Sequence, residues 1–154
     1  SQGRKHTNEA TQPEFCQSAK CVQRPIMRDI TQVLAAVRSK KYEIIDARAP
    51  GRFLGIEPEP RKGLRAGHIP GSKNVFFKTL LHDDNTMKSP DDLRVVFEAA
   101  GVDMSMPVIT SCGSGITAAI VNLALAHTGS NNHFLYDGSW AEWGMSQTLP
   151  IDIA

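Results

Sequence analysis

The chain has 154 residues, 41% of them hydrophobic, which is enough for one domain with a sizeable core. Its 17 Lys and Arg residues against 16 Asp and Glu give a formal net charge of +1 without a long run of one sign, so nucleic acid is not an expected partner. The longest apolar run, residues 118–126, contains Asn122 and is too short to cross a membrane.

The N-terminal stretch differs in character from the rest of the chain. Residues 1–14 are polar and contain Pro13, which predicts a tail or interdomain linker ahead of a domain over residues 15–154. Three scattered cysteines do not make a disulfide framework, and this favours a reducing compartment, cytoplasmic or mitochondrial. Cys16 and Cys21 lack the further cysteines or histidines of a metal site, so we interpret them as packing or incidental thiols. We expect neither a metal nor an organic cofactor.

The first half of the domain predicts a helix, a strand, a long loop and a second strand. Apolar residues recur at helical spacing from Ile30 to Val37 behind Asp29, and the pattern ends at residues 39–41. Residues 42–46 then form a short apolar strand. Gly and Pro recur through residues 51–71, which predicts a long loop, and such loops in compact domains are usually functional. Residues 73–76 are a candidate second strand.

The second half predicts alternating helices and strands. Ser89 as N-cap and Pro90 as the first helical residue open a helix that ends at Gly101. The remaining elements are a strand over residues 107–111, a helix over 116–127, a strand over 133–136 and a short helix with Trp140 and Trp143. Strands that alternate with helices at this spacing predict a mainly parallel sheet with helices on both faces.

Cys112 directly follows an apolar strand and is followed by Gly113 and Gly115 before a helix begins. This arrangement predicts a tight loop whose backbone N–H groups converge on the sulfur. Those amides and the positive end of the helix would stabilise a thiolate or a persulfide anion. An inert buried thiol is the alternative for a lone cysteine, but the carboxyl end of a strand is where α/β sheets bind ligands, which favours a functional thiol.

Three segments resemble, in order, the motifs of rhodanese-type sulfurtransferases. Residues 112–118 (CGSGITA) are similar to the active-site loop of the mercaptopyruvate sulfurtransferases, residues 137–143 (DGSWAEW) to the C-terminal rhodanese signature, and residues 65–72 (RAGHIPGS) to the motif after the first strand. The resemblance implies an α/β rhodanese-like fold, a five-stranded parallel sheet with helices on both faces. It also implies that this is the catalytic, C-terminal domain of a tandem pair whose N-terminal rhodanese domain is missing from this chain.

The resemblance implies a mercaptopyruvate sulfurtransferase reaction. Cys112 takes sulfur from 3-mercaptopyruvate as a persulfide, pyruvate is released, and thioredoxin, a small thiol or cyanide accepts the sulfur. Thioredoxin reduction would release hydrogen sulfide. Arg52 and Arg61, in the stretch RFLGIEPEPR, would bind the substrate carboxylate and carbonyl. The alternative is that both are surface arginines paired with Glu57 or Glu59.

The expected active-site loop comprises Gly113, Ser114, Gly115, Ile116 and Thr117. The hydroxyl groups of Ser114 and Thr117 can donate hydrogen bonds to a sulfur or a carbonyl oxygen, or can cap the following helix. We interpret Ser114 as functional and leave the role of Thr117 open.

Two related enzymes and one non-catalytic role compete with this interpretation. Thiosulfate sulfurtransferases carry Arg and Lys after the cysteine, two cations suited to a dianion, whereas this chain has Gly113 and Ser114, so thiosulfate would be held weakly. Phosphatases of related fold need an Arg six residues after the cysteine, and Ala118 occupies that position, which argues against them. A module that relays persulfide to a partner stays open.

Several other residues are interpreted as structural. Arg48 follows the first strand closely and is expected to pair with Asp46 or the sheet end. His68 lies in the motif that shapes the fold, so we interpret it as a structural histidine rather than a general base. Trp140 and Trp143, three residues apart on a short helix, are expected in the core.

Overall fold

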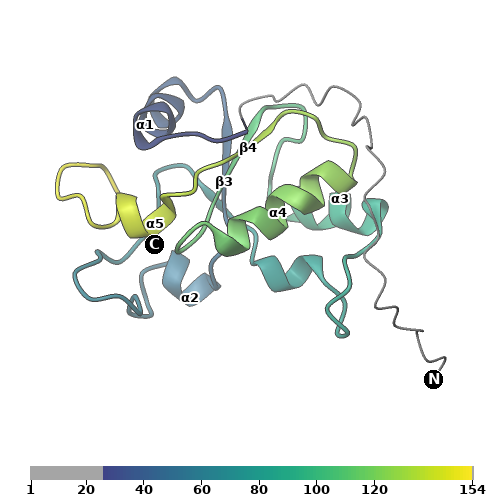
Figure 1. Cartoon of the computed structure of the whole chain (residues 1–154), viewed down its shortest axis with the longest axis horizontal. Helices are drawn as coiled ribbons and strands as arrows, with labels where there is room; N and C mark the ends of the chain where they lie inside the picture. The colour runs from purple at the N-terminus through teal and green to yellow at the C-terminus, as the bar shows by residue number, and fades with distance from the viewer. Residues whose placement is uncertain (1–25, 154) are drawn as a thin grey trace, which may run out of the picture.

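Four parallel strands form the centre of the computed structural model, which describes residues 26–153 (Figure 1). In chain order they are β1 (Glu43–Asp46), β2 (Lys73–Asn74), β3 (Val108–Ser111) and β4 (His133–Leu135), and in the sheet they lie in the order β2-β1-β3-β4. Five strands were expected. Beyond β4, Met27 makes a single parallel bridge to Leu135, so the fifth position is held by one residue pair. The expected tail, Cys16 and Cys21 lie outside the described residues.

Helices cover both faces of this sheet, which confirms the expected parallel α/β architecture. One face carries α1 (Ile30–Ser39) and α5 (Ser139–Trp143); the other carries α3 (Pro90–Ala99), α4 (Ile116–His127) and the 3-10 helix η1 (Phe77–Leu80) (Figure 1). Every residue of β1 and β3 is buried because these strands are central and covered on both sides. None of the helices within residues 26–153 is long and apolar enough to span a bilayer.

Two apolar clusters fill the spaces between sheet and helices. The cluster under α3 and α4 includes Leu93 and Phe97, both fully buried. The cluster under α1 and α5 contains Trp140 and Trp143, also fully buried, as expected for core residues. Each indole N–H is satisfied by a backbone carbonyl, at 2.9 Å and 2.8 Å, because a buried N–H without an acceptor is costly. The tryptophans thereby anchor α5 next to the carboxyl edge of the sheet.

The long segment expected to be a loop contains a short helix, α2 (Pro50–Phe53). Pro50 stands at its first position, where the missing N–H costs nothing. The predicted start of α3 is confirmed, because the Ser89 side chain accepts a hydrogen bond from the Asp92 N–H. The second strand, expected over residues 73–76, is shorter than predicted and ends at Asn74, and residues 77–80 form η1.

The cap of α1 gives a test of the fold. The Asp29 carboxylate accepts a hydrogen bond from the Gln32 N–H at 2.8 Å, and the Gln32 side chain accepts one from the Asp29 N–H at 3.0 Å. Asp29→Ala removes the first of these, so we expect the free energy of unfolding in urea to fall by about 1 kcal/mol. Asp83→Ala, at an exposed loop carboxylate, is the control and should leave it nearly unchanged. Equal losses in both variants would contradict the assignment of the cap.

Candidate functional site

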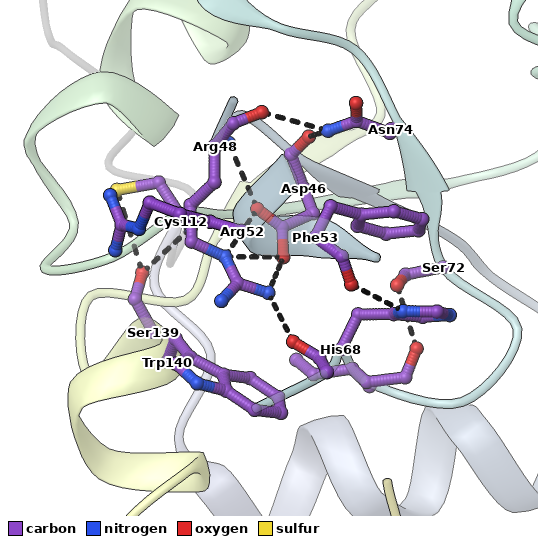
Figure 2. Close-up of polar contacts among 12 residues, drawn as sticks. Asp46, Arg48, Arg52, Phe53, His68, Ser72, Asn74, Cys112, Ser139 and Trp140 are labelled. Carbon is purple, nitrogen blue, oxygen red and sulfur yellow. Dashed lines mark hydrogen bonds and ion pairs between the residues drawn. The ribbon is translucent and has the colours of Figure 1, made fainter. Parts of the chain in front are cut away.

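The loops that follow β1, β3 and β4 meet at the carboxyl edge of the sheet (Figure 2). Because the strands are parallel, their carboxyl ends share one edge, and this is where ligands bind in such sheets. The loop after β1 leads into α2, which carries Arg52. The loop after β3 begins with Cys112, and the turn after β4 leads into α5 with Ser139. Three segments far apart in sequence therefore supply one site.

The sulfur of Cys112 lies in a cradle of backbone amides. Its Sγ accepts hydrogen bonds from the N–H of Gly115 at 3.1 Å and of Ser114 at 3.4 Å. α4 begins at Ile116, so its positive end lies immediately beside the sulfur. This confirms the predicted convergence of loop amides on Sγ. The arrangement can stabilise an anion on this sulfur, whether a thiolate or a persulfide.

A second set of contacts ties the backbone of Cys112 to α5. The Ser139 hydroxyl accepts a hydrogen bond from the Cys112 N–H at 3.0 Å (Figure 2). It donates one to the Tyr136 carbonyl at 2.8 Å. The backbone N–H of Trp140 donates a hydrogen bond to the Cys112 carbonyl at 2.9 Å. The sequence analysis did not single out Ser139. The sequence indication for Ser139 was its place in the DGSW segment, which resembles a family signature. In the structure its backbone has a left-handed φ of 49°, a conformation that is uncommon for residues other than glycine.

Tyr136, whose carbonyl accepts the Ser139 hydroxyl, has a phenol group that is neutral at neutral pH. Burial raises the pKa of the Tyr136 phenol, and its hydrogen bond to Glu142, at 2.8 Å, raises the pKa further. The ring packs edge-on against Trp143, with centroids 6.5 Å apart. Tyr136 is therefore a hydrogen-bond donor within the scaffold at neutral pH and not a base for the reaction.

A cavity of about 260 Å³ lies against the cysteine loop. Its wall consists of Arg52, Glu59, Pro60, Arg61, Leu64, Gly113 and Ser114. The two arginines proposed for substrate binding thus share one cavity with two residues of the loop. Cys112 itself is buried, with 1% of its surface exposed, and is not part of the wall. A larger hollow of about 550 Å³ lies near the start of β1, away from the cysteine loop.

A buried network of charges forms the floor of this region. Arg48 pairs with Asp46 at 2.7 Å, which confirms the expected partner, and with Glu59 at 2.7 Å. Glu59 also pairs with Arg52 at 2.6 Å. The Glu59 side chain is only 2% exposed, so this pairing differs from the surface ion pair considered as the alternative. This role of Glu59 was not predicted, because a carboxylate between prolines is typical of an exposed loop.

The remaining loop residues take different positions. Gly115 is the N-cap of α4 and provides no side-chain cap, so neither Ser114 nor Thr117 serves as the helix cap. Ile116 is 75% exposed at the first turn. Within residues 26–153, the Thr117 hydroxyl makes no hydrogen bond to another group, and its role stays open.

His68 lies outside the cavity wall and has a structural role, as expected. Its Nδ1 lies 2.8 Å from the Phe53 carbonyl, and its ring stacks on the Phe53 ring with centroids 3.8 Å apart (Figure 2). The contact fixes the end of α2. Across the described part of the chain, residues 26–153, His, Cys, Asp and Glu side chains form no cluster of three suited to a metal ion.

Comparisons with known proteins place this geometry in a family. The model of the rhodanese-like domain matches residues 29–146. The chain is 41% identical to a thiosulfate sulfurtransferase of Rattus norvegicus over 143 residues, which are 92% of this chain and 48% of the relative. It is 46% identical to a 3-mercaptopyruvate sulfurtransferase of Escherichia coli over 123 residues, which are 80% of this chain and 43% of the relative.

The solved structures give the same result. The crystal structure of Tum1 protein from Saccharomyces cerevisiae superposes with a TM-score of 0.72 at 36% identity, over 79% of this chain and 44% of that one. The expected rhodanese-like α/β fold is therefore confirmed. The chain spans about half the length of the curated relatives that it matches.

Gly115 offers a test of the cradle, with Gly129 at the other end of α4 as a matched control. Both have φ near +90°, at 87° and 89°. A Cβ on Gly129 would meet nothing within 4 Å, whereas one on Gly115 would lie 2.4 Å from Oδ1 and 2.8 Å from the carbonyl oxygen of Asp137. Gly129→Ala should cost about 1–2 kcal/mol of unfolding free energy, from the left-handed backbone alone.

Gly115→Ala should cost clearly more than that and should also slow alkylation of Cys112 by iodoacetamide, because the shifted loop no longer aims its amides at Sγ. Urea unfolding and intact-mass alkylation rates measure the two effects. Equal losses of unfolding free energy in both alanine variants, with Cys112 alkylated at the wild-type rate in each, would show that the close packing at Gly115 does not control the reactivity of the Cys112 thiol.

Proposed function

The chain belongs to the rhodanese-like domain family, and on that basis we propose that it is the catalytic domain of a sulfurtransferase that loads sulfur from 3-mercaptopyruvate onto Cys112. The observation that carries the proposal is the amide cradle around Sγ, at 3.1 Å and 3.4 Å, beside a cavity that holds two arginines. Relatives named for thiosulfate and for 3-mercaptopyruvate both match, so the choice of donor rests on the site itself.

The charge of the cavity favours a donor with one carboxylate. Arg52, Arg61 and Glu59 are its ionisable wall residues and together leave one positive charge. The loop adds no cation, because Gly113 and Ser114 follow the cysteine. A thiosulfate dianion would keep one charge uncompensated, whereas the single carboxylate of mercaptopyruvate would be neutralised. Mercaptopyruvate is therefore the better match.

The proposed reaction has two steps at Cys112. The thiolate attacks the thiol sulfur of 3-mercaptopyruvate, a sulfur–sulfur bond forms, and the carbon–sulfur bond breaks. The electron pair of that bond stays with pyruvate as its enolate, which then takes up a proton. An acceptor thiolate next attacks the outer sulfur and regenerates the Cys112 thiolate. Splitting the transfer in this way is covalent catalysis, and the cradle stabilises the anion in both states.

The cavity residues take separate roles in this proposal. Arg52 and Arg61 bind the carboxylate and carbonyl oxygens of the donor, since guanidinium groups suit planar oxygen pairs. The Ser114 hydroxyl donates a hydrogen bond to donor oxygen or sulfur. Thioredoxin or a small thiol is the proposed acceptor.

An N-terminal rhodanese-like domain is the proposed neighbour of this one. The chain covers 43–48% of the two curated relatives described above, which leaves room for a second domain of similar size. Three large apolar side chains are exposed in segments next to the site: Ile56, Ile116 and Met145, with 76%, 75% and 60% of their surface open. Such a neighbour would cover them and exclude water from the cavity.

Sulfur loading tests the proposed function directly. We expect 3-mercaptopyruvate to add one sulfur atom to the intact mass of the protein and to release pyruvate in equal amount, because each attack by Cys112 produces both. Cys112→Ser should show neither product. Thiosulfate at equal concentration should load the protein more slowly. Faster loading by thiosulfate would make it the donor, and absence of loading by either compound would refute the proposed activity.

The arginines can be tested by the donor concentration needed for loading. Arg52→Ala and Arg61→Ala each remove a charge-assisted hydrogen bond, so the half-saturating concentration of mercaptopyruvate should rise about tenfold or more. Lys62→Ala, at the exposed cation next to Arg61 that does not line the cavity, is the control and should change it little. Wild-type values in both arginine variants would rule out this pair as the carboxylate site.

A further inference from the structure

Glu59 is a buried carboxylate in the cavity wall that joins two guanidinium groups. Its Oε1 accepts a hydrogen bond from Nη1 of Arg48 at 2.7 Å, and its Oε2 accepts one from Nη2 of Arg52 at 2.6 Å. With 2% of its side chain exposed, it pays a large desolvation cost that these two cations offset. The position of the Glu59 carboxylate therefore depends on both arginines, and the positions of the two guanidinium groups depend on Glu59.

The two arginines differ in how firmly they are held. The Arg48 side chain is 1% exposed, bonds to the Asp46 carboxylate and the Gly67 carbonyl, and lies 4.5 Å from the Trp140 ring centroid. The Arg52 side chain is 25% exposed, and among residues 26–153 Glu59 is the one group that its guanidinium bonds. Glu59 thus connects the more exposed Arg52 guanidinium, which has fewer contacts, to the buried Arg48 guanidinium.

This pairing also sets the orientation of Arg52. Glu59 accepts from Nε at 3.2 Å and from Nη2 at 2.6 Å, so Nη1 has no hydrogen-bond acceptor within the described residues. Nη2 lies beside the loop: a Cβ on Gly113 would be 2.9 Å from it. The guanidinium is therefore held next to Gly113, the residue that follows Cys112. Its Nη1 is available to donate a hydrogen bond to an oxygen of the bound sulfur donor.

We propose that Glu59 is a positioning residue that holds the Arg52 guanidinium in the orientation that receives the anionic group of the sulfur donor. The inference rests on the proposed function, in which Arg52 binds the donor. Without the Glu59 charge, Arg48 and Arg52 repel each other, and because Arg48 is fixed, Arg52 is the side chain that moves. Arg52 would then bind the donor from many rotamers instead of one.

A double-mutant cycle on the whole chain tests the proposal, with mercaptopyruvate as the probe and sulfur loading of Cys112 as the readout. Glu59→Gln should raise the half-saturating donor concentration about tenfold and leave the loading rate at saturation within about threefold, because binding orientation is lost while the sulfur cradle is intact. In the Arg52→Ala background, Glu59→Gln should add less than about a twofold change.

Glu57→Gln is the matched control, since it removes the same charge from an exposed position of the same loop and should leave the half-saturating concentration unchanged. If Glu59→Gln does not fold, as its melting curve will show, Glu59→Asp keeps the negative charge but shortens the side chain, so it no longer reaches the Arg52 guanidinium in the same geometry and should raise the half-saturating concentration as well. The inference would be overturned if the Glu59 substitution raised the half-saturating donor concentration by the same factor in the wild-type and Arg52→Ala backgrounds. It would also be overturned if the substitution did not raise that concentration at all.

The cycle separates failure of this inference from failure of the proposed function. If Arg52→Ala alone leaves the half-saturating concentration unchanged, Arg52 does not bind the donor, and the proposed donor site is wrong. If Arg52→Ala raises that concentration and the Glu59 variants do not, the donor site stands and the positioning role of Glu59 is wrong.

Discussion

The buried guanidinium of Arg48 holds the carboxyl edge of this sheet together. It connects the end of β1 through Asp46, the long loop after α2 through Glu59 and Gly67, and α5 through the face of Trp140. A buried cation is tolerated only when carboxylates and carbonyls surround it, so the loop has to fold inward to supply them. Glu59, which is one of these carboxylates, also forms part of the wall of the cavity beside the cysteine loop. The same carboxylate therefore neutralises the buried cation and helps to shape the site.

Much of the fold could be predicted because its signals are local. The helical spacing behind Asp29, the cap at Ser89 and the Cys-Gly-x-Gly turn each depend on a few neighbouring residues. The amide cradle at Sγ is of this kind, since three consecutive residues after Cys112 determine it. The motif resemblance added the family, which the comparison with known domains confirmed.

What could not be predicted depends on contacts between distant segments. Glu59 is flanked by prolines in a polar stretch, which is typical of a solvated loop. Its burial depends on Arg48 and Arg52, two cations that precede it by several residues. Ser139 reaches Cys112 across 27 positions of sequence. The sheet also has one strand fewer than expected, because a single residue pair at Met27 holds its outer position. The donor-binding roles of Arg52 and Arg61 stay predictions, although both line one cavity.

The close approach of Arg52 to Gly113 has an evolutionary consequence. A Cβ at position 113 would lie 2.9 Å from Nη2 of Arg52, so a side chain there requires the end of the Arg52 side chain to shift. The two positions are therefore epistatic in this chain: a substitution at one alters which substitutions the other can accept. A cationic side chain at position 113 would in addition bring a second positive charge next to the Arg52 guanidinium. Substitutions at position 113 are therefore expected to be accompanied by a change in where the Arg52 guanidinium lies.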